Sequence, residues 1–313
     1  MDRFPIALPY NDYVQSANTL FNFMKEFSYL KDILEYSAII PRYCVEDITY
    51  LKVKTEEGDF DKIAVLQKCF CDIPFHKLTD SFKVHGSGEN FGRLTEIEKM
   101  KFSRPISHPD FYGKFGIAFS KKWGEVHNLQ PVHYINEASE YLQKFSAMLN
   151  QSLNADDLSD LNADDLMRRL SYLKPLRGCM HRWFKRENGE NIDIEVTKNF
   201  HDEREWRYIP KSEDLEALKL EAVIANPFVY GSVQQLRDIN SGLTQEKYRP
   251  IWLPFSYDEI RYIIVPDDQN RLDIIDTIMS IPDERFANPE NVMRQRYVLI
   301  SKILVLEEMR KDW

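Results

Sequence analysis

Two glutamates, Glu203 and Glu205, are the residues of this chain whose types and spacing come nearest to a reactive site. They lie two residues apart in FHDEREWRYIP, residues 200–210. If this segment is a strand, both side chains share a face with Arg207, and the glutamates lie about 7 Å apart. Carboxylates at that separation flank a space about as wide as a sugar ring, where they can stabilise an oxocarbenium-like centre or orient a ribose hydroxyl. The spacing alone favours a plainer interpretation, in which Glu203 and Arg207 form ion pairs with neighbours across an exposed strand, worth about 0.2–1 kcal/mol each.

The four cysteines do not point to a metal site or to a disulfide framework. Cys44, Cys69, Cys71 and Cys179 are few and irregularly spaced, and the C-x-C pair lacks a second pair at zinc-ligand spacing. We therefore expect structural thiols in a reducing cytoplasm and no bound metal.

A basic segment lies between residues 168 and 186. It has no acidic residue and contains Arg168, Arg169, Lys174, Arg177, Arg182, Lys185 and Arg186. With its interleaved aromatic residues it could bind the backbone of RNA or DNA. It could equally form a helix face that pairs with the acidic segment just before it.

The elements that must position these residues follow from hydrophobic periodicity. The pattern predicts a short strand at TLFNF (19–23), a helix from Phe27, and a strand ending at the CFCDIP turn (69–74). Further strands are predicted at FYGKFGIAFSKKW (111–123), PVHYI (131–135), 195–210 and IRYIIVP (260–266), with a helix at NRLDIIDTIMSI (270–281).

The segments between these elements are expected to be less regular. Residues 83–105 are rich in Gly, Ser and charge and are interpreted as a long loop or insertion. Residues 150–168 hold the duplicated LNADDL and are interpreted as a second insertion, and 290–313 as one C-terminal helix. No βαβ repeat emerges, so we predict a single α+β domain over 1–313, with a mixed sheet, flanking helices and insertions.

Composition excludes several classes of protein. The chain has 313 residues, of which 43% are hydrophobic and 13% aromatic, so it has the composition of a folded protein. A net charge of -9 argues against coating nucleic acid by bulk electrostatics, and no apolar stretch approaches the ~20 residues of a membrane span. The N-terminus lacks the features of a signal peptide, and no P-loop, G-x-G-x-x-G after a strand, H-E-x-x-H or G-x-S-x-G is present.

An ordered set of blocks resembles the AbiGi abortive phage-resistance family. The blocks are TLFNFMKEFSYLKDILEYSAIIPRYCVED, CFCDIP, SHPDFYGKFGIAFSKKW, NLQPVHY and FHDEREWRYIP, from about residue 19 to 210, with a weaker echo at 255–266. The resemblance implies an antitoxin whose partner is a nucleotidyltransferase toxin.

The order of the blocks also resembles that of ADP-ribosyltransferases of the DarT and diphtheria-toxin-like kind. This resemblance implies an ADP-ribosyltransferase-like mixed sheet and NAD as substrate, to modify a nucleic acid or a protein. It makes Glu205 the catalytic carboxylate and Glu203 its upstream partner. It also makes Tyr112 and Phe119 candidates for the nicotinamide wall, and Arg42 a candidate contact of the NAD phosphates.

The first block departs from the ADP-ribosyltransferase pattern. Where that family has a His-Phe-Thr-like triplet, this chain has Asn22, Phe23 and Met24. Asn22 can donate a hydrogen bond, whereas Met24 cannot replace a hydroxyl. Three hypotheses remain: an NAD-using enzyme with an altered contact, a non-catalytic antitoxin that binds a toxin, and a nucleic-acid binder that acts through the basic segment 168–186. The first requires that Asn22, Tyr112, Glu203 and Glu205 converge on one cleft.

Overall fold

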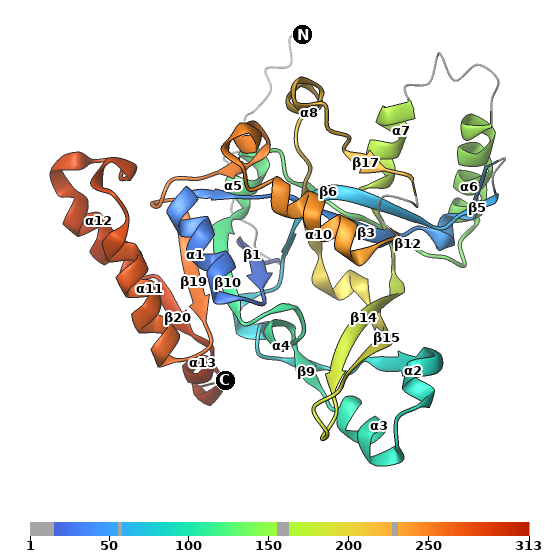
Figure 1. Ribbon diagram of the computed structural model, residues 1–313, viewed down its shortest axis with the longest axis horizontal. Helices are drawn as coiled ribbons and strands as arrows, with labels where there is room; N and C mark the ends of the chain where they lie inside the picture. Colours follow the sequence, from blue (N-terminus) through green and yellow to red (C-terminus); the bar gives the residue numbers. More distant parts are fainter. Residues whose placement is uncertain (1–15, 56–57, 155–162, 227–230, 313) are drawn as a thin grey trace, which may run out of the picture.

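A mixed sheet forms the centre of the molecule (Figure 1). The computed structural model describes residues 16–55, 58–154, 163–226 and 231–312. Across the sheet the strands follow in the order β11 (Gln130–Pro131), β16 (Glu205–Tyr208), β6 (Lys62–Cys71), β1 (Thr19–Met24), β10 (Phe115–Ser120), β19 (Ile260–Val265) and β20 (Ile303–Val305). Two more, β3 (Arg42–Asp47) and β17 (Val223–Ile224), also pair with β6. Neighbours are antiparallel except β19 and β20, which are parallel.

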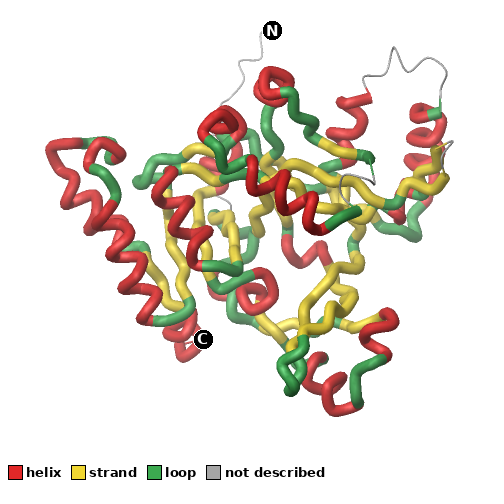
Figure 2. The backbone as a smooth tube through the Cα atoms, viewed as in Figure 1, coloured by secondary structure: helices red, strands yellow, loops and turns green. Residues whose placement is uncertain are grey.

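Helices pack around this sheet, as Figure 2 shows. On one face, α1 (Phe27–Tyr36) buries Leu30, Ile33 and Leu34, which recur at helical spacing, and α11 (Asp268–Ser280) buries Ile274 and Ile278. Burial of each such side chain contributes about 1.5–3 kcal/mol. The predicted strand at 19–23, the helix from Phe27 and the helix at 270–281 are therefore confirmed.

Strand β1 pairs differently on its two sides, and this opens the sheet. It pairs with β10 at all six residues, from Thr19 to Met24, but with β6 only where Phe21 lies opposite Cys71. Beyond that point the side-chain nitrogen of Asn22 donates to the carbonyl oxygen of Cys69, at 2.8 Å. The pairing of β3 with β6 reaches only as far as Gln67, opposite Arg42. A gap therefore lies between β3 and β1 along residues 68–70 of β6. This gap is where the cavity described below forms.

Of the two interpretations of residues 83–105, a long loop or an insertion, the loop is wrong. This segment holds β8 (His85–Ser87), α2 (Gly88–Gly92) and α3 (Glu96–Phe102). β8 joins β14 (Arg177–Lys185) and β15 (Asn191–Asn199) in a separate sheet of order β14-β15-β8. Apolar residues distant in sequence make this region a packed unit, among them Leu94, Phe102 and Ile194.

The prediction of one C-terminal helix over 290–313 is also wrong. The segment forms α12 (Val292–Ile300), strand β20, and α13 (Leu306–Asp312). The apolar run ILV at 303–305 pairs in parallel with β19 rather than continuing the helix. Leu306 and Met309 of α13 then pack beneath Phe21 and Cys71.

The region around residues 150–168 is helical where it is described. It holds α6 (Glu140–Leu153) and α7 (Ala163–Leu170), and half of the duplicated LNADDL lies outside the described residues. The other helices are α4 (His108–Tyr112), α5 (Lys121–Val126), α8 (Ser212–Leu218) and α10 (Val233–Gly242). Short strand pairs are β2 (Ala38–Ile39) with β18 (Leu253–Pro254), β4 (Val53–Thr55) with β5 (Gly58–Phe60), β7 (Ser81–Phe82) with β9 (Ile106–Ser107), and β12 (His133–Ile135) with β13 (Leu173–Pro175).

Among the described residues, no helix is both long enough and apolar enough to span a membrane.

Candidate functional site

The segment that carries the two glutamates is not one continuous strand. Phe200–Glu203 form a 3₁₀ turn, Arg204 adopts the left-handed conformation with φ 45°, and β16 starts at Glu205. The prediction that Glu203 and Glu205 share a strand face is therefore wrong, although Glu205 and Arg207 do share one. The bend brings Glu203 back beside β6, where its carbonyl oxygen accepts from the Asp72 N–H at 3.1 Å.

Both glutamates nevertheless reach the same cavity, which has a volume of about 370 Å³. Asn22, Arg42 and Tyr112 also line it, so five of the six residues singled out from the sequence converge there. They come from β1, β3, α4, the 3₁₀ turn and β16. The geometric requirement of the enzyme hypothesis, convergence of Asn22, Tyr112, Glu203 and Glu205 on one cleft, is met.

Phe119, the sixth residue, lies elsewhere. Its ring is fully buried in the core, stacked on Trp123 with the ring centroids 4.0 Å apart. Phe119 belongs to the same apolar cluster as Leu30 of α1 and Ile274 of α11, and β10 contributes no residue to the lining of the cavity. Phe119 is therefore not a wall of this cavity.

Aromatic rings from two elements form one wall of the cavity. His108 lies between Phe23 and Tyr112, with ring centroids 5.4 Å and 4.6 Å away. All three residues line the cavity. Burial lowers the pKa of His108 to about 3, so the ring is neutral at physiological pH. The wall is thus an uncharged aromatic surface able to hold a flat ring.

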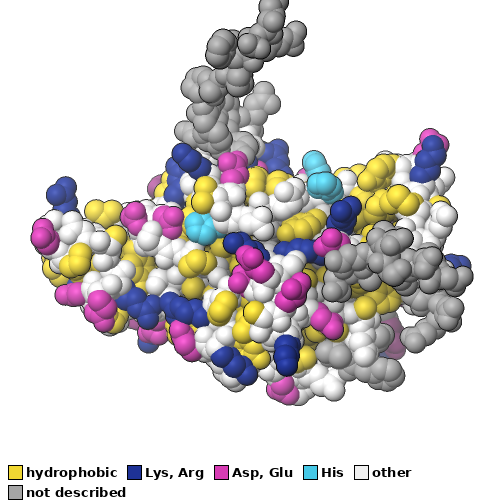
Figure 3. All heavy atoms as spheres, turned by 90° about the horizontal axis from the view of Figure 1, so that it is seen from above, with side chains coloured by type: hydrophobic (Ala, Val, Ile, Leu, Met, Phe, Trp, Pro, Cys, Tyr) yellow, Lys and Arg dark blue, Asp and Glu magenta, His cyan; other side chains and the backbone are white. Residues whose placement is uncertain are grey.

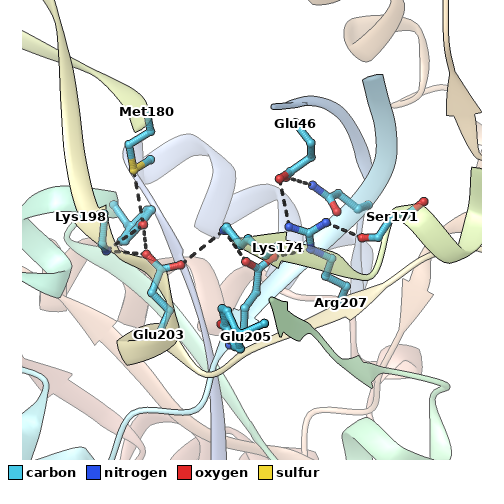
Figure 4. A network of polar contacts seen from close by, with 11 residues as sticks. Glu46, Ser171, Lys174, Met180, Lys198, Glu203, Glu205 and Arg207 are labelled. Carbon is cyan, nitrogen blue, oxygen red and sulfur yellow. Dashed lines mark hydrogen bonds and ion pairs between the residues drawn. The ribbon is translucent and has the colours of Figure 1, made fainter. Parts of the chain in front are cut away.

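Lys174 joins the two glutamates (Figure 4). Its ammonium nitrogen lies 2.6 Å from Oε2 of Glu205 and 3.6 Å from Oε2 of Glu203. Arg207 donates from Nε to the other oxygen of Glu205, also at 2.6 Å. Despite burial, the positive charges of Arg207 and Lys174 hold the pKa of Glu205 well below its usual range.

Glu203 has its own pair of donors. Its Oε1 accepts from the ammonium of Lys198 and from the hydroxyl of Tyr112. Lys174 and Lys198 lower the pKa of this carboxyl against the opposing effect of burial. Both glutamates are therefore ionised carboxylates in an almost closed site, with 6% of Glu203 and 4% of Glu205 exposed.

Arg207 connects this site to β3. It is fully buried, and its guanidinium contacts Glu46 at 3.1 Å and the carbonyl oxygen of Ser171. Gln67 donates to the other oxygen of Glu46 at 2.6 Å. Three carboxylates, those of Glu46, Glu203 and Glu205, thus face three cations, those of Lys174, Lys198 and Arg207. The network is balanced in charge, which is the condition for burying so many ions.

The basic segment 168–186 is not a helix face, because it spans the end of α7, β13 and β14, and its basic side chains do not share one surface. Alternation along β14 exposes Arg177 and Lys185, while Arg182 is partly buried and lies over the ring of Phe102. The remaining members lie in separate places. Arg168 donates to the carbonyl oxygen of Pro210, and Arg169 is exposed on α7. Lys174 lies between the two glutamates, and Arg186 pairs with Glu98 and Glu190. On the face of the molecule drawn in Figure 3, Lys and Arg side chains are mixed with Asp and Glu side chains.

Several residues of the site were missed in the sequence. Lys174 and Arg207 stood inside segments already noted, Lys198 had only a weak local signal, and Glu46 and Gln67 had none. A buried lysine can be suspected where a strand alternates as Ile192, Ile194, Val196, Lys198, since the charged residue then falls on the apolar face. Among the described residues, no group of His, Cys, Asp and Glu could hold a metal ion.

Fold and site together define an α+β protein with a buried, charge-balanced cavity beside a split in its sheet. Comparison with known proteins identifies its family. The family model described as "Putative abortive phage resistance protein AbiGi, antitoxin" matches residues 97–266. The "Abortive phage resistance protein AbiGi" of Lactococcus lactis subsp. cremoris is 32% identical over 287 residues, which cover 88% of this chain and 100% of that protein. The chain belongs to the AbiGi family. No solved structure matches it.

Proposed function

We propose that the protein acts in abortive phage resistance and that its cavity is an ADP-ribosyltransferase-like site that uses NAD. Membership of the AbiGi family supports the first part. The observation that carries the second is the convergence of Asn22, Arg42, Tyr112, Glu203 and Glu205 on one cavity with an aromatic wall. The resemblance to ADP-ribosyltransferases implies a role at the NAD for each of these residues.

The proposed chemistry matches the state of the glutamates. Cleavage of the nicotinamide–ribose bond builds positive charge at the anomeric carbon, and a fixed, ionised carboxylate beside the ribose stabilises it. Arg207 and Lys174 keep Glu205 ionised and fix both of its oxygens in place. Each oxygen keeps a second lone pair for a ribose hydroxyl. The rings of His108 and Tyr112 supply a surface on which a nicotinamide can lie.

Release of nicotinamide from NAD tests this proposal. The purified protein is incubated with NAD, with and without a nucleotidyltransferase toxin of the kind that the resemblance implies as partner, and nicotinamide is quantified by chromatography. We expect Glu205→Gln to lower the rate by at least a hundredfold, since it removes the charge that stabilises the transition state. Glu213→Gln, on the exposed start of α8, is the matched control. Equal rates for the wild type and Glu205→Gln, or no release by the wild type with the partner present, would rule the proposal out.

A second candidate function is binding of a toxin without catalysis. The matching family model carries the word antitoxin. In the described part of the chain, β14 pairs with β15 on one side only, and its exposed side chains include Trp183, which is 62% exposed. A nine-residue strand with a free edge can accept an extended segment of another protein.

Neutralisation of the co-expressed toxin separates the two candidates. If binding suffices, growth rescue should survive Glu205→Gln and be lost in Trp183→Ala combined with Lys185→Ala, which removes exposed side chains that a segment docked on β14 would contact. If rescue instead requires Glu205 and tolerates the β14 changes, the binding-only candidate fails.

A further inference from the structure

Two cations at the rim of the cavity take no part in the charge-balanced network. Arg42 is the first residue of β3, and Lys68 lies on β6 next to Gln67, the cross-strand partner of Arg42. Both side chains line the 370 Å³ cavity and also a neighbouring cavity of about 270 Å³. Arg42 and Lys68 therefore lie where the two cavities meet, a place called the junction below.

The charges of these two residues are only partly offset, by Asp32 of the adjoining cavity, which interacts with Arg42. Lys174, Lys198 and Arg207 each have a carboxylate within 4.0 Å, whereas no such ion pair is formed by Arg42 or Lys68 with any described residue. Because the inner network sums to zero, the charged residues that line the adjoining cavity, Lys25, Arg42 and Lys68 against Asp32, leave an excess of two positive charges. In a chain with a net charge of -9, a local excess of this kind indicates a site for an anion.

The geometry also prepares Arg42 to bind. Its guanidinium carbon lies 4.8 Å from the centre of the Tyr29 ring, a cation–π contact that fixes the planar group. This contact uses the face of the guanidinium and leaves its N–H donors free for bidentate contact with phosphate oxygens. The aromatic wall continues past the junction, since Phe23 and Tyr112 line both cavities.

We propose that this junction binds the phosphates of a nucleoside diphosphate, with Arg42 and Lys68 as the phosphate-binding residues and a flat ring of the ligand against Phe23, His108 and Tyr112. The inference deepens the proposed function, because it adds Lys68 to the site and fixes the direction of the ligand. Its diphosphate lies at the rim, while the part facing Glu205 points inward. Phosphate binding at the junction does not require that NAD be cleaved.

The charge of Lys68 gives the site a pH dependence. Burial, and secondarily repulsion by Arg42, lower the pKa of Lys68 to about 8. Other ionisable groups near the junction are Cys44 and Cys69, whose pKa values burial raises, and Asp32, Lys25 and Tyr112 of the adjoining cavity. The phosphate itself is fully ionised above about pH 7. Affinity should therefore fall as the pH rises from 7 to 9, because Lys68 loses its proton.

Calorimetric titration of the full chain with ADP, inorganic pyrophosphate and adenosine tests the proposal. We expect ADP and pyrophosphate to bind and adenosine to bind at least tenfold more weakly than ADP. Arg42→Gln and Lys68→Gln should each weaken ADP binding roughly tenfold to a hundredfold, the effect of one charged hydrogen bond. Lys54→Gln, an exposed lysine on β4, should leave it unchanged. The loss of affinity between pH 7 and 9 should disappear in Lys68→Gln.

Three results would overturn the proposal: no binding of ADP or pyrophosphate by the wild type, equal binding of adenosine and ADP, or wild-type affinity in both glutamine variants. Pyrophosphate binding equal to that of ADP would show a phosphate site without a ring contact and would overturn the placement of the ring. ADP binding without nicotinamide release would refute the proposed reaction and leave the phosphate site standing.

Discussion

At the scale of single residues, Arg207 shows why the glutamate pair is both buried and charged. Removal of one partner from a buried ion pair costs about 3–5 kcal/mol, since the other charge stays behind without compensation. Arg207 contacts both Glu205 and Glu46, so it compensates two carboxylates at once. The exposed-pair interpretation of the E-x-E segment is thereby excluded: these ion pairs lie inside the protein, where geometry and charge are fixed.

His108 makes the cavity sensitive to acid. Its pKa is lowered to about 3 by burial, while Glu203 acts to raise it and Lys198 to lower it further. Below its ordinary pKa of 6.5 the unfolded chain binds a proton that the folded state does not, so stability falls with decreasing pH until about 3. The slope is at most about 1.4 kcal/mol per pH unit.

We therefore predict that His108→Phe flattens the pH dependence between pH 6 and 4.5. The free energy of unfolding, measured with urea at several pH values, should fall less steeply in the variant than in the wild type. His133→Phe, at an exposed histidine, is the control and should keep the wild-type slope. Parallel curves for wild type and His108→Phe would show that His108 is not held neutral.

At the scale of elements, the sequence predicts those parts whose pattern is local. Leu30, Ile33 and Leu34 mark α1 by their spacing, and the apolar run at 63–66 marks β6. The bend at Arg204 was missed because a left-handed arginine has no sequence signal comparable to glycine. β20 was missed because its strand state depends on pairing with β19, about forty residues earlier. Glu205 and Tyr112 were found through the order of the blocks, whereas Lys198 and Glu46 reach the site only through the fold.

Gly113 lies between α4 and β10, and its conformation sets the position of the aromatic wall. It joins α4 to β10 at φ 143°, a conformation that other residues rarely adopt, and a Cβ there would overlap the backbone carbonyl of Met24. We predict that Gly113→Ala destabilises the protein by about 1–3 kcal/mol and shifts Tyr112 away from Glu203. Urea unfolding measures the first effect, and ADP affinity the second. Gly92→Ala, where a Cβ meets open space, should change stability by less than about 0.5 kcal/mol. An equal effect at both glycines would contradict this role of Gly113.

At the scale of the whole molecule, segments from near both ends of the chain build the same site. β1 supplies Phe21, Asn22 and Phe23 to the cavity, and α13 packs Met309 in the same apolar cluster as Phe21. Arg310 of α13 donates to Asp110 of α4 at 2.6 Å, the helix that carries His108 and Tyr112. The C-terminal helix thus supports the cavity from beneath.

Met309→Ala tests whether the far end of the chain holds the site together. Met309 is 8% exposed, so truncation removes buried contacts and leaves a void, at a cost of about 2–5 kcal/mol in the free energy of unfolding. Because Met309 belongs to the same apolar cluster as Phe21 of β1, ADP affinity should fall as well, even though Met309 does not line the cavity. Met100→Ala makes the same substitution at a methionine that is 74% exposed and should change neither quantity measurably. If Met309→Ala lowers stability by the expected amount but keeps wild-type ADP affinity, α13 supports the fold without positioning the site. If it changes neither, α13 does not pack on β1 in solution.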